Sequence, residues 1–271
     1  MHYAAKTVEY IFKNFWRILL LAIIPAVSLG LFTRPAAIFD YYTNVDYYGA
    51  KHDFWEVFVK ISFFECVWWK ILIGFVALAI ITAVSLGIIL RHFKVGQFSF
   101  GKALTYLNDN IIMVTSVFVV ALFAITLAQF LISGIIMFVA VFATSFTQYV
   151  VFSVIGIIIV YFLMLILFSI GMMWSAELLE TGASFFTGFG LAMRKIRGRV
   201  FSLFVGSIIP VSVLFAEACL FAYLNVSFAF VINIVVYLFI YMYYVAFIMV
   251  AYYDISGIER EDLKKVNIWK R

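Results

Sequence analysis

The chain has 271 residues, of which 66% are apolar and only 12% are charged, and its formal net charge is +5. A soluble domain of this size needs far more polar surface, so the composition excludes an ordinary soluble protein. In a membrane protein, an excess of positive charge is typical of loops that stay in the cytosol. We therefore predict an all-α, polytopic membrane protein with no nucleic-acid partner.

Six apolar stretches predict six transmembrane helices. No charged residue occurs between Asn110 and Ala176, and a run of that length folds back as a hairpin because one span takes about 20 residues. Helices are the only choice, since an open strand would leave backbone amides unpaired in lipid. The first run lacks a signal-peptide cleavage pattern, so we expect it to be retained. The predicted spans are residues 15–33, 70–90, 111–138, 150–174, 201–224 and 228–252.

The basic residues divide unevenly between the two sides of this arrangement. One side holds the N-terminus, residues 91–110, residues 175–200 and the C-terminal tail. The other side carries only four of the 19 Lys and Arg residues, namely Arg34, Lys51, Lys60 and Lys70. The positive-inside rule then places both termini in the cytosol. We predict that the chain lies in the plasma membrane. We predict one six-helix domain over residues 1–253 and a cytosolic tail over residues 254–271.

Residues 31–69 form the only long connection on the external side. This segment is dense in Tyr, Phe and Trp and also carries five carboxylates. We expect an aromatic belt with one interfacial helix over residues 54–69. Since long loops are often functional, a cap over an external cavity or a docking surface for a partner is the alternative.

Three stretches on the cytosolic side repeat one amphipathic spacing, in steps of four, three and four residues. Each stretch directly precedes an outgoing span, which predicts interfacial helices at the N-terminus and in two elbows, residues 91–110 and 175–200. Three helix-hairpin repeats would follow, but so apolar a chain also produces this spacing by chance, and both interpretations stay open. The residues are Ala4, Val8, Ile11 and Phe15; Phe100, Leu104, Leu107 and Ile111; and Phe189, Met193, Ile196 and Val200.

The second elbow ends in a basic stretch. We expect its four charges to contact anionic lipid headgroups or a protein partner at the inner surface, and headgroups are favoured. Glu177 and Glu180 lie three residues apart on one helical face. They are expected either to pair with this stretch or with Lys102, which would fix the elbow, or to stay solvated. The basic residues are Arg194, Lys195, Arg197 and Arg199.

One carboxylate lies deep in the fifth span. Glu217 is costly there unless it is paired, protonated or hydrated. If Asn225 marks the turn between the last two spans, Asn233 lies at a similar depth on the sixth span, and Gln129 in the third span reaches the same level. We predict a polar cluster of these three residues in the outer half of the membrane. Hydrogen bonds that hold the bundle together are favoured over a transport path.

Catalytic groups are not evident in the sequence. There is no HExxH, GxSxG or P-loop motif, and no pair of aspartates lies within a span. The histidines fall outside the apolar stretches and the two cysteines are isolated, which argues against a metal site. We predict no enzymatic activity, metal or cofactor, while an unfamiliar carboxylate site at Glu177 and Glu180 is the least favoured alternative. The three histidines are His2, His52 and His92, and the two cysteines are Cys66 and Cys219.

Residues 177–199 comprise an acidic helix end, an elbow and a basic turn before the next span, and residues 250–255 end the last span. In these features the C-terminal half resembles bacterial six-span proteins of the glycerophosphodiester phosphodiesterase membrane-domain-like group. The resemblance implies a membrane-embedded helical domain, and since this sequence lacks the catalytic domain it implies no phosphodiesterase activity.

Permease subunits of ATP-driven transporters are a second comparison. They also have about six spans and a cytosolic docking helix, and the 175–200 loop is in the right place. It lacks the GluAlaAla-type run and the spaced glycine of such a helix. We therefore expect a scaffold or accessory protein in envelope or lipid-related processes, with lipids and a second protein as partners. A permease-type subunit is the alternative.

Overall fold

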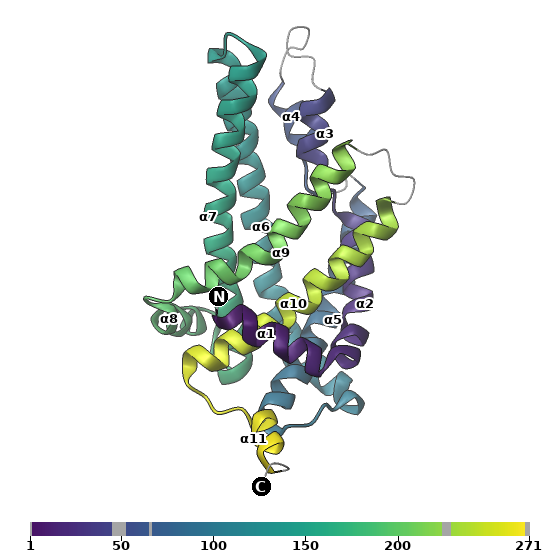
Figure 1. Cartoon of the computed structure of the whole chain (residues 1–271), viewed down its shortest axis with the longest axis vertical. Coiled ribbons are helices and arrows are strands. Elements are labelled where there is room, and N and C mark those ends of the chain that lie inside the picture. Colours follow the sequence, from purple (N-terminus) through teal and green to yellow (C-terminus); the bar gives the residue numbers. More distant parts are fainter. Residues whose placement is uncertain (1, 45–52, 65–66, 224–228, 269–271) are drawn as a thin grey trace.

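The computed structural model describes residues 2–44, 53–64, 67–223 and 229–268, and this part of the chain is all-α (Figure 1). Six of its helices are long and apolar enough to cross a membrane, which confirms a multi-pass helical membrane protein. They are α2 (Phe15–Phe32), α5 (Trp68–Val95), α6 (Ala103–Phe142), α7 (Phe146–Thr181), α9 (Val200–Tyr223) and α10 (Ala229–Ser256).

Five shorter helices lie at the two ends of the bundle. They are α1 (His2–Lys13), α3 (Ala37–Asn44), α4 (Phe54–Lys60), α8 (Phe185–Ile196) and α11 (Glu261–Ile268). We call the end that carries α1, α8 and α11 the basic end, and the end that carries α3, α4 and the α6–α7 turn the far end (Figure 1). Helix α4 stops at Lys60 rather than continuing to residue 69, so the interfacial helix is shorter than predicted.

Helix α10 is the centre of the bundle. It packs along α2, while α5 packs between α2 and α6. In the most apolar part of α10 61% of the residues are buried, against 11% in α6 and 17% in α7. The α6–α7 hairpin is therefore peripheral, and it reaches beyond the far ends of α9 and α10 (Figure 1).

Helices α6 and α7 are longer than the predicted spans 111–138 and 150–174. Each helix continues past the predicted span because no proline interrupts it there. The hairpin turn is tight: α6 ends at Phe142, and the Ser145 hydroxyl caps α7 by accepting from the Gln148 amide. At the other end α7 stops at Gly182, whose left-handed φ of 63° suits glycine.

The predicted elbows take two different forms. Helices α1 and α8 are separate elements, and the chain bends after them at Asn14 and at Gly198, whose φ is 80°. Residues 91–110 form no separate α-helix: residues 91–95 end α5, a single 3-10 turn spans Phe100–Lys102, and α6 begins at Ala103. The three stretches therefore differ in structure, because the middle one has no break before its span.

Candidate functional site

Glu177 lies at the basic end of α7, where it is only 1% exposed. The Lys195 ammonium of α8 is 2.6 Å from its carboxylate. The Tyr252 hydroxyl of α10 donates to the same carboxylate at 3.0 Å and accepts from Lys195 at 2.8 Å. Burial lowers the pKa of Lys195, but its bonds to Glu177 and Tyr252 outweigh burial and raise that pKa above its ordinary value. The sequence-predicted pairing of Glu177 with the basic stretch is therefore present.

Glu180 has a matching set of partners one turn further along α7. Lys94, in the last turn of α5, is 3.1 Å from its carboxylate, and the Tyr253 hydroxyl donates to it at 3.0 Å. Lys102, the partner predicted from sequence, is exposed at the start of α6, and within the described ranges no ion pair joins it to either glutamate. The two glutamates thus tie α7 to α5, α8 and α10.

Only part of the basic stretch remains available at the surface. Arg199 donates to the Ile255 carbonyl at 3.0 Å, and Lys195 is held by Glu177. Arg194 and Arg197 are exposed, and Arg199 is exposed as well although it makes this bond. Lys195 and Arg199 therefore contribute contacts to the fold, while three of the four cations remain exposed.

Helix α8 has two apolar faces. Gly188, Ala192 and Ile196 are buried, and Gly188 lies so close to Leu178 that a Cβ would be 2.5 Å from it. The exposed face carries a second apolar row, Phe186, Phe189 and Met193. The prediction that Met193 and Ile196 share one face is wrong, because the small residues at positions 188 and 192 set the side that packs against α7. A protein-bound helix with an exposed apolar row is suited to the membrane surface.

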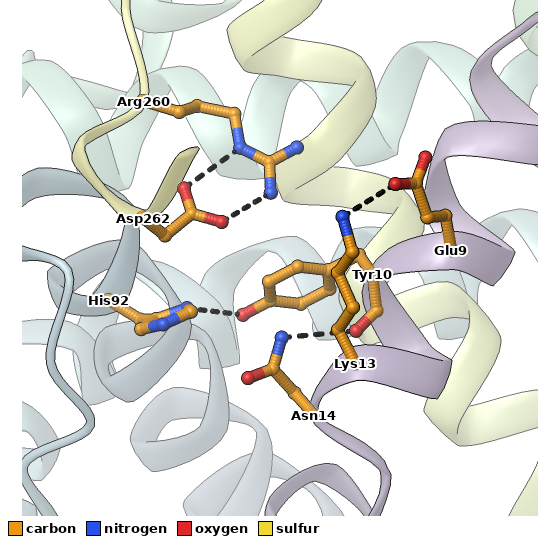
Figure 2. Close-up of polar contacts among 7 residues, drawn as sticks. All are labelled: Glu9, Tyr10, Lys13, Asn14, His92, Arg260 and Asp262. Atoms are coloured by element: carbon orange, nitrogen blue, oxygen red, sulfur yellow. Dashed lines mark hydrogen bonds and ion pairs between the residues drawn. The ribbon is translucent and has the colours of Figure 1, made fainter. Parts of the chain in front are cut away.

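The C-terminal segment folds back onto the bundle (Figure 2). The Arg260 guanidinium forms two bonds with Asp262, at 3.1 and 2.7 Å, and lies 4.0 Å from the centre of the Phe93 ring and 5.2 Å from that of Tyr10. The Tyr10 hydroxyl is 3.0 Å from His92 Nδ1. We call these five residues the tail clasp. The predicted tail is thus not a free extension, and no sequence pattern indicated this contact.

A cleft of about 490 Å³ opens beside the tail clasp, between α1 and the C-terminal segment. Its charged side chains lie in pairs: Lys6 with Asp254, Lys13 with Glu9 at 2.6 Å, and Lys264 with Glu259 at 2.8 Å. A search of the described residues finds no group of three metal-binding side chains. The charged side chains of the cleft therefore largely neutralise one another.

The predicted intramembrane cluster is divided. Glu217 is 6% exposed and Asn233 is 9% exposed. Both Glu217 carboxylate oxygens and Asn233 Oδ1 are buried and have no hydrogen-bond partner among the described residues. Gln129 instead donates to the Phe58 carbonyl at 3.0 Å, because α6 packs against α4. Gln129 therefore belongs to a contact between the hairpin and the far-end helices. Asn225, the expected turn, lies outside the described residues.

Comparisons of the chain with protein-family models, with curated proteins and with solved structures found no match. The resemblance seen in residues 177–199 therefore stays a prediction.

Proposed function

We propose that the protein is a non-catalytic scaffold of the plasma membrane, with its basic end and both termini in the cytosol. One observation carries this proposal. The buried glutamates of the basic end, Glu177 and Glu180, are each held by a lysine and a tyrosine from other helices, and so they join elements rather than face a substrate. This use of charge is typical of structural contacts between helices.

Anionic lipid is the first proposed partner. Arg194 and Arg197 are exposed beside the outward apolar row of α8, so the helix can bury its rings among acyl chains while its guanidinium groups meet phosphate. Native mass spectrometry tests this contact. Changing both arginines to Gln should reduce the retention of an anionic lipid but not of phosphatidylcholine, whereas Lys264→Gln should change neither. Equal retention of both lipids by the double variant and the wild type would contradict it.

The second proposed partner is another membrane protein at the α6–α7 hairpin, which reaches beyond the far ends of α9 and α10 (Figure 1). Phe138 and Phe142, near the end of α6, are exposed. A photo-crosslinking amino acid at Phe138 should capture one defined membrane protein, while the same probe at the exposed Leu220 of α9 should capture lipid. Lipid adducts alone at both positions would argue against a scaffold.

Orientation has a test of its own. In a chain with both native cysteines changed to Ser, an impermeant thiol reagent should label Thr43→Cys on α3 in intact cells and should leave Arg197→Cys unlabelled. Both positions are exposed, so access depends on the side of the membrane. The reverse labelling would overturn the placement of the basic end in the cytosol.

A permease-type subunit is the second candidate, and the buried Glu217 favours it. In that case α8 would dock a cytosolic ATPase. However, α8 is held against its own chain by Lys195 and by a bond of 3.0 Å from the Trp174 indole to the Phe185 carbonyl. Glu217→Gln should abolish transport and preserve expression if this candidate is correct.

A further inference from the structure

Glu217 on α9 and Asn233 on α10 carry buried acceptors that have no hydrogen-bond donor among the described residues. Both residues are more than nine-tenths buried, and their unpartnered atoms are both carboxylate oxygens and Asn233 Oδ1. An unpaired polar group in hydrocarbon is unfavourable, and an ionised carboxylate is the most unfavourable case. Two such groups on neighbouring helices therefore call for one further component.

Glu217 and Asn233 lie on neighbouring helices. Helices α9 and α10 pack together, and the two residues stand at similar distances from the connection between them. Tyr237 lies one turn beyond Asn233 on the same face of α10. The Tyr237 hydroxyl is itself occupied by Thr33, at 2.6 Å.

The component that is missing is one hydrogen-bond donor with one positive charge. A proton supplies both, because a protonated carboxyl has an O–H that can donate, while an ionised one only accepts. A divalent ion would instead leave a net positive charge in the apolar interior. We propose that Glu217 and Asn233 form a proton-binding site within the membrane, in which the protonated Glu217 carboxyl donates to Asn233 Oδ1. This inference does not depend on the scaffold proposal.

The surroundings contain few other charges. Helix α7 has no Asp, Glu, Lys, Arg or His from residue 146 to residue 176, although it carries the phenols of Tyr149 and Tyr161. Helix α1, which contacts α9, carries Lys6 and Glu9. Helix α3 reaches α9 where Phe39 packs on Phe215, which brings Asp40 to that side, and Arg34 follows α2. Tyr237 is the titratable group that lies one turn from Asn233 on α10.

An apolar carbodiimide tests the site, because this reagent adds only to protonated carboxyls. The full chain is held in lipid nanodiscs and the modified peptides are quantified by mass spectrometry. Glu217 should react in mildly acid buffer, and its rate should fall about tenfold or more in alkaline buffer. Glu177 is an internal control: it is equally buried but paired with Lys195, and it should stay unmodified throughout.

Two variants and one salt refine the test. Glu217→Gln should abolish the labelling at this position, and Asn233→Leu should keep it in acid but move its loss to a pH about one unit lower, because the acid form loses its acceptor. Absence of labelling in acid, a rate independent of pH, or a wild-type profile in Asn233→Leu would overturn the proposal. Protection by sodium chloride but not by choline chloride would also overturn it, since a metal cation would then occupy the site.

Discussion

The basic end and the α9–α10 pair each bury a glutamate, and the surroundings of the two differ. Glu177 meets an ammonium at 2.6 Å and a phenol at 3.0 Å, both from other helices. Glu217 meets neither a cation nor a hydrogen-bond donor among the described residues. Burial alone therefore does not define the role of a buried carboxyl. Glu177 joins helices through its partners, whereas Glu217 has no hydrogen-bond donor among the described residues.

The largest expected effect comes from removing the partner of Glu177. Lys195→Met keeps the apolar stem but leaves the carboxylate buried without a cation, and it should lower the free energy of unfolding by about 3 kcal/mol. Denaturant unfolding in mixed micelles measures the change. Adding Glu177→Leu to Lys195→Met should restore most of the loss, since an apolar pair replaces an isolated charge. A Lys195→Met protein as stable as the wild type would show that the ion pair contributes little.

The tail clasp is a second place where the basic end satisfies its charges. Arg260→Ala removes two bonds to Asp262 and two ring contacts, and it should lower stability by about 2 kcal/mol. Hydrogen exchange should rise first in α11. Lys264→Ala, a change in an exposed pair, is the matched control and should alter neither measurement. A similar effect of both variants would show that the contacts of the tail clasp do not account for the loss of stability.

The difference between the two glutamates should appear most directly in one matched substitution. Glu217→Gln removes a carboxyl that has no partner, so stability should stay within about 1 kcal/mol of wild type or rise. Glu177→Gln, by contrast, removes a charge that Lys195 needs and should be destabilising. Thermal unfolding of the two variants side by side decides the matter. Equal destabilisation by both would mean that Glu217 has a structural partner.

The smallest expected effect is a dependence on alkaline pH. The pKa of Lys195 is raised in the folded protein, so its pair with Glu177 contributes fully below the ordinary value of 10.5 and is lost as the pH rises through the higher folded value. Lys195→Arg stays charged over this range and should be less sensitive. Unfolding temperatures measured up to strongly alkaline pH compare the two, and identical slopes would exclude Lys195 as the cause.

The six spans could be predicted from sequence because length and apolar composition suffice to place a helix in lipid. The pairing of Glu177 with the basic stretch could also be predicted, because the elbow after α7 brings that stretch back to the end of α7. The contacts of Tyr252 and Tyr253 were not, because a tyrosine in an apolar helix gives no sign of which way the helix is rotated. Lys94 was missed because it ends a different span.

The tail clasp and the position of Gln129 show the same limit. Arg260 reaches Phe93 across a large sequence separation, and neither residue belongs to a periodic pattern that points to the other. Gln129 was predicted to lie at the depth of Glu217 and is buried, but its partner is the Phe58 carbonyl because α6 packs against α4. Depth follows from the distance along a helix, whereas partners follow from packing.

The length of the α6–α7 hairpin has a consequence for the lipid around it. At about 1.5 Å of rise per residue, the uncharged part of α6, residues 111–142, is roughly 48 Å long. The hydrocarbon layer of a bilayer is about 30 Å thick, while α2, with 18 residues, matches that thickness. Hydrophobic mismatch on this side of the molecule must be relieved by tilt or by local thickening of the bilayer. A membrane deformed on one side only would sort the protein toward thicker bilayers and toward neighbours with equally long spans.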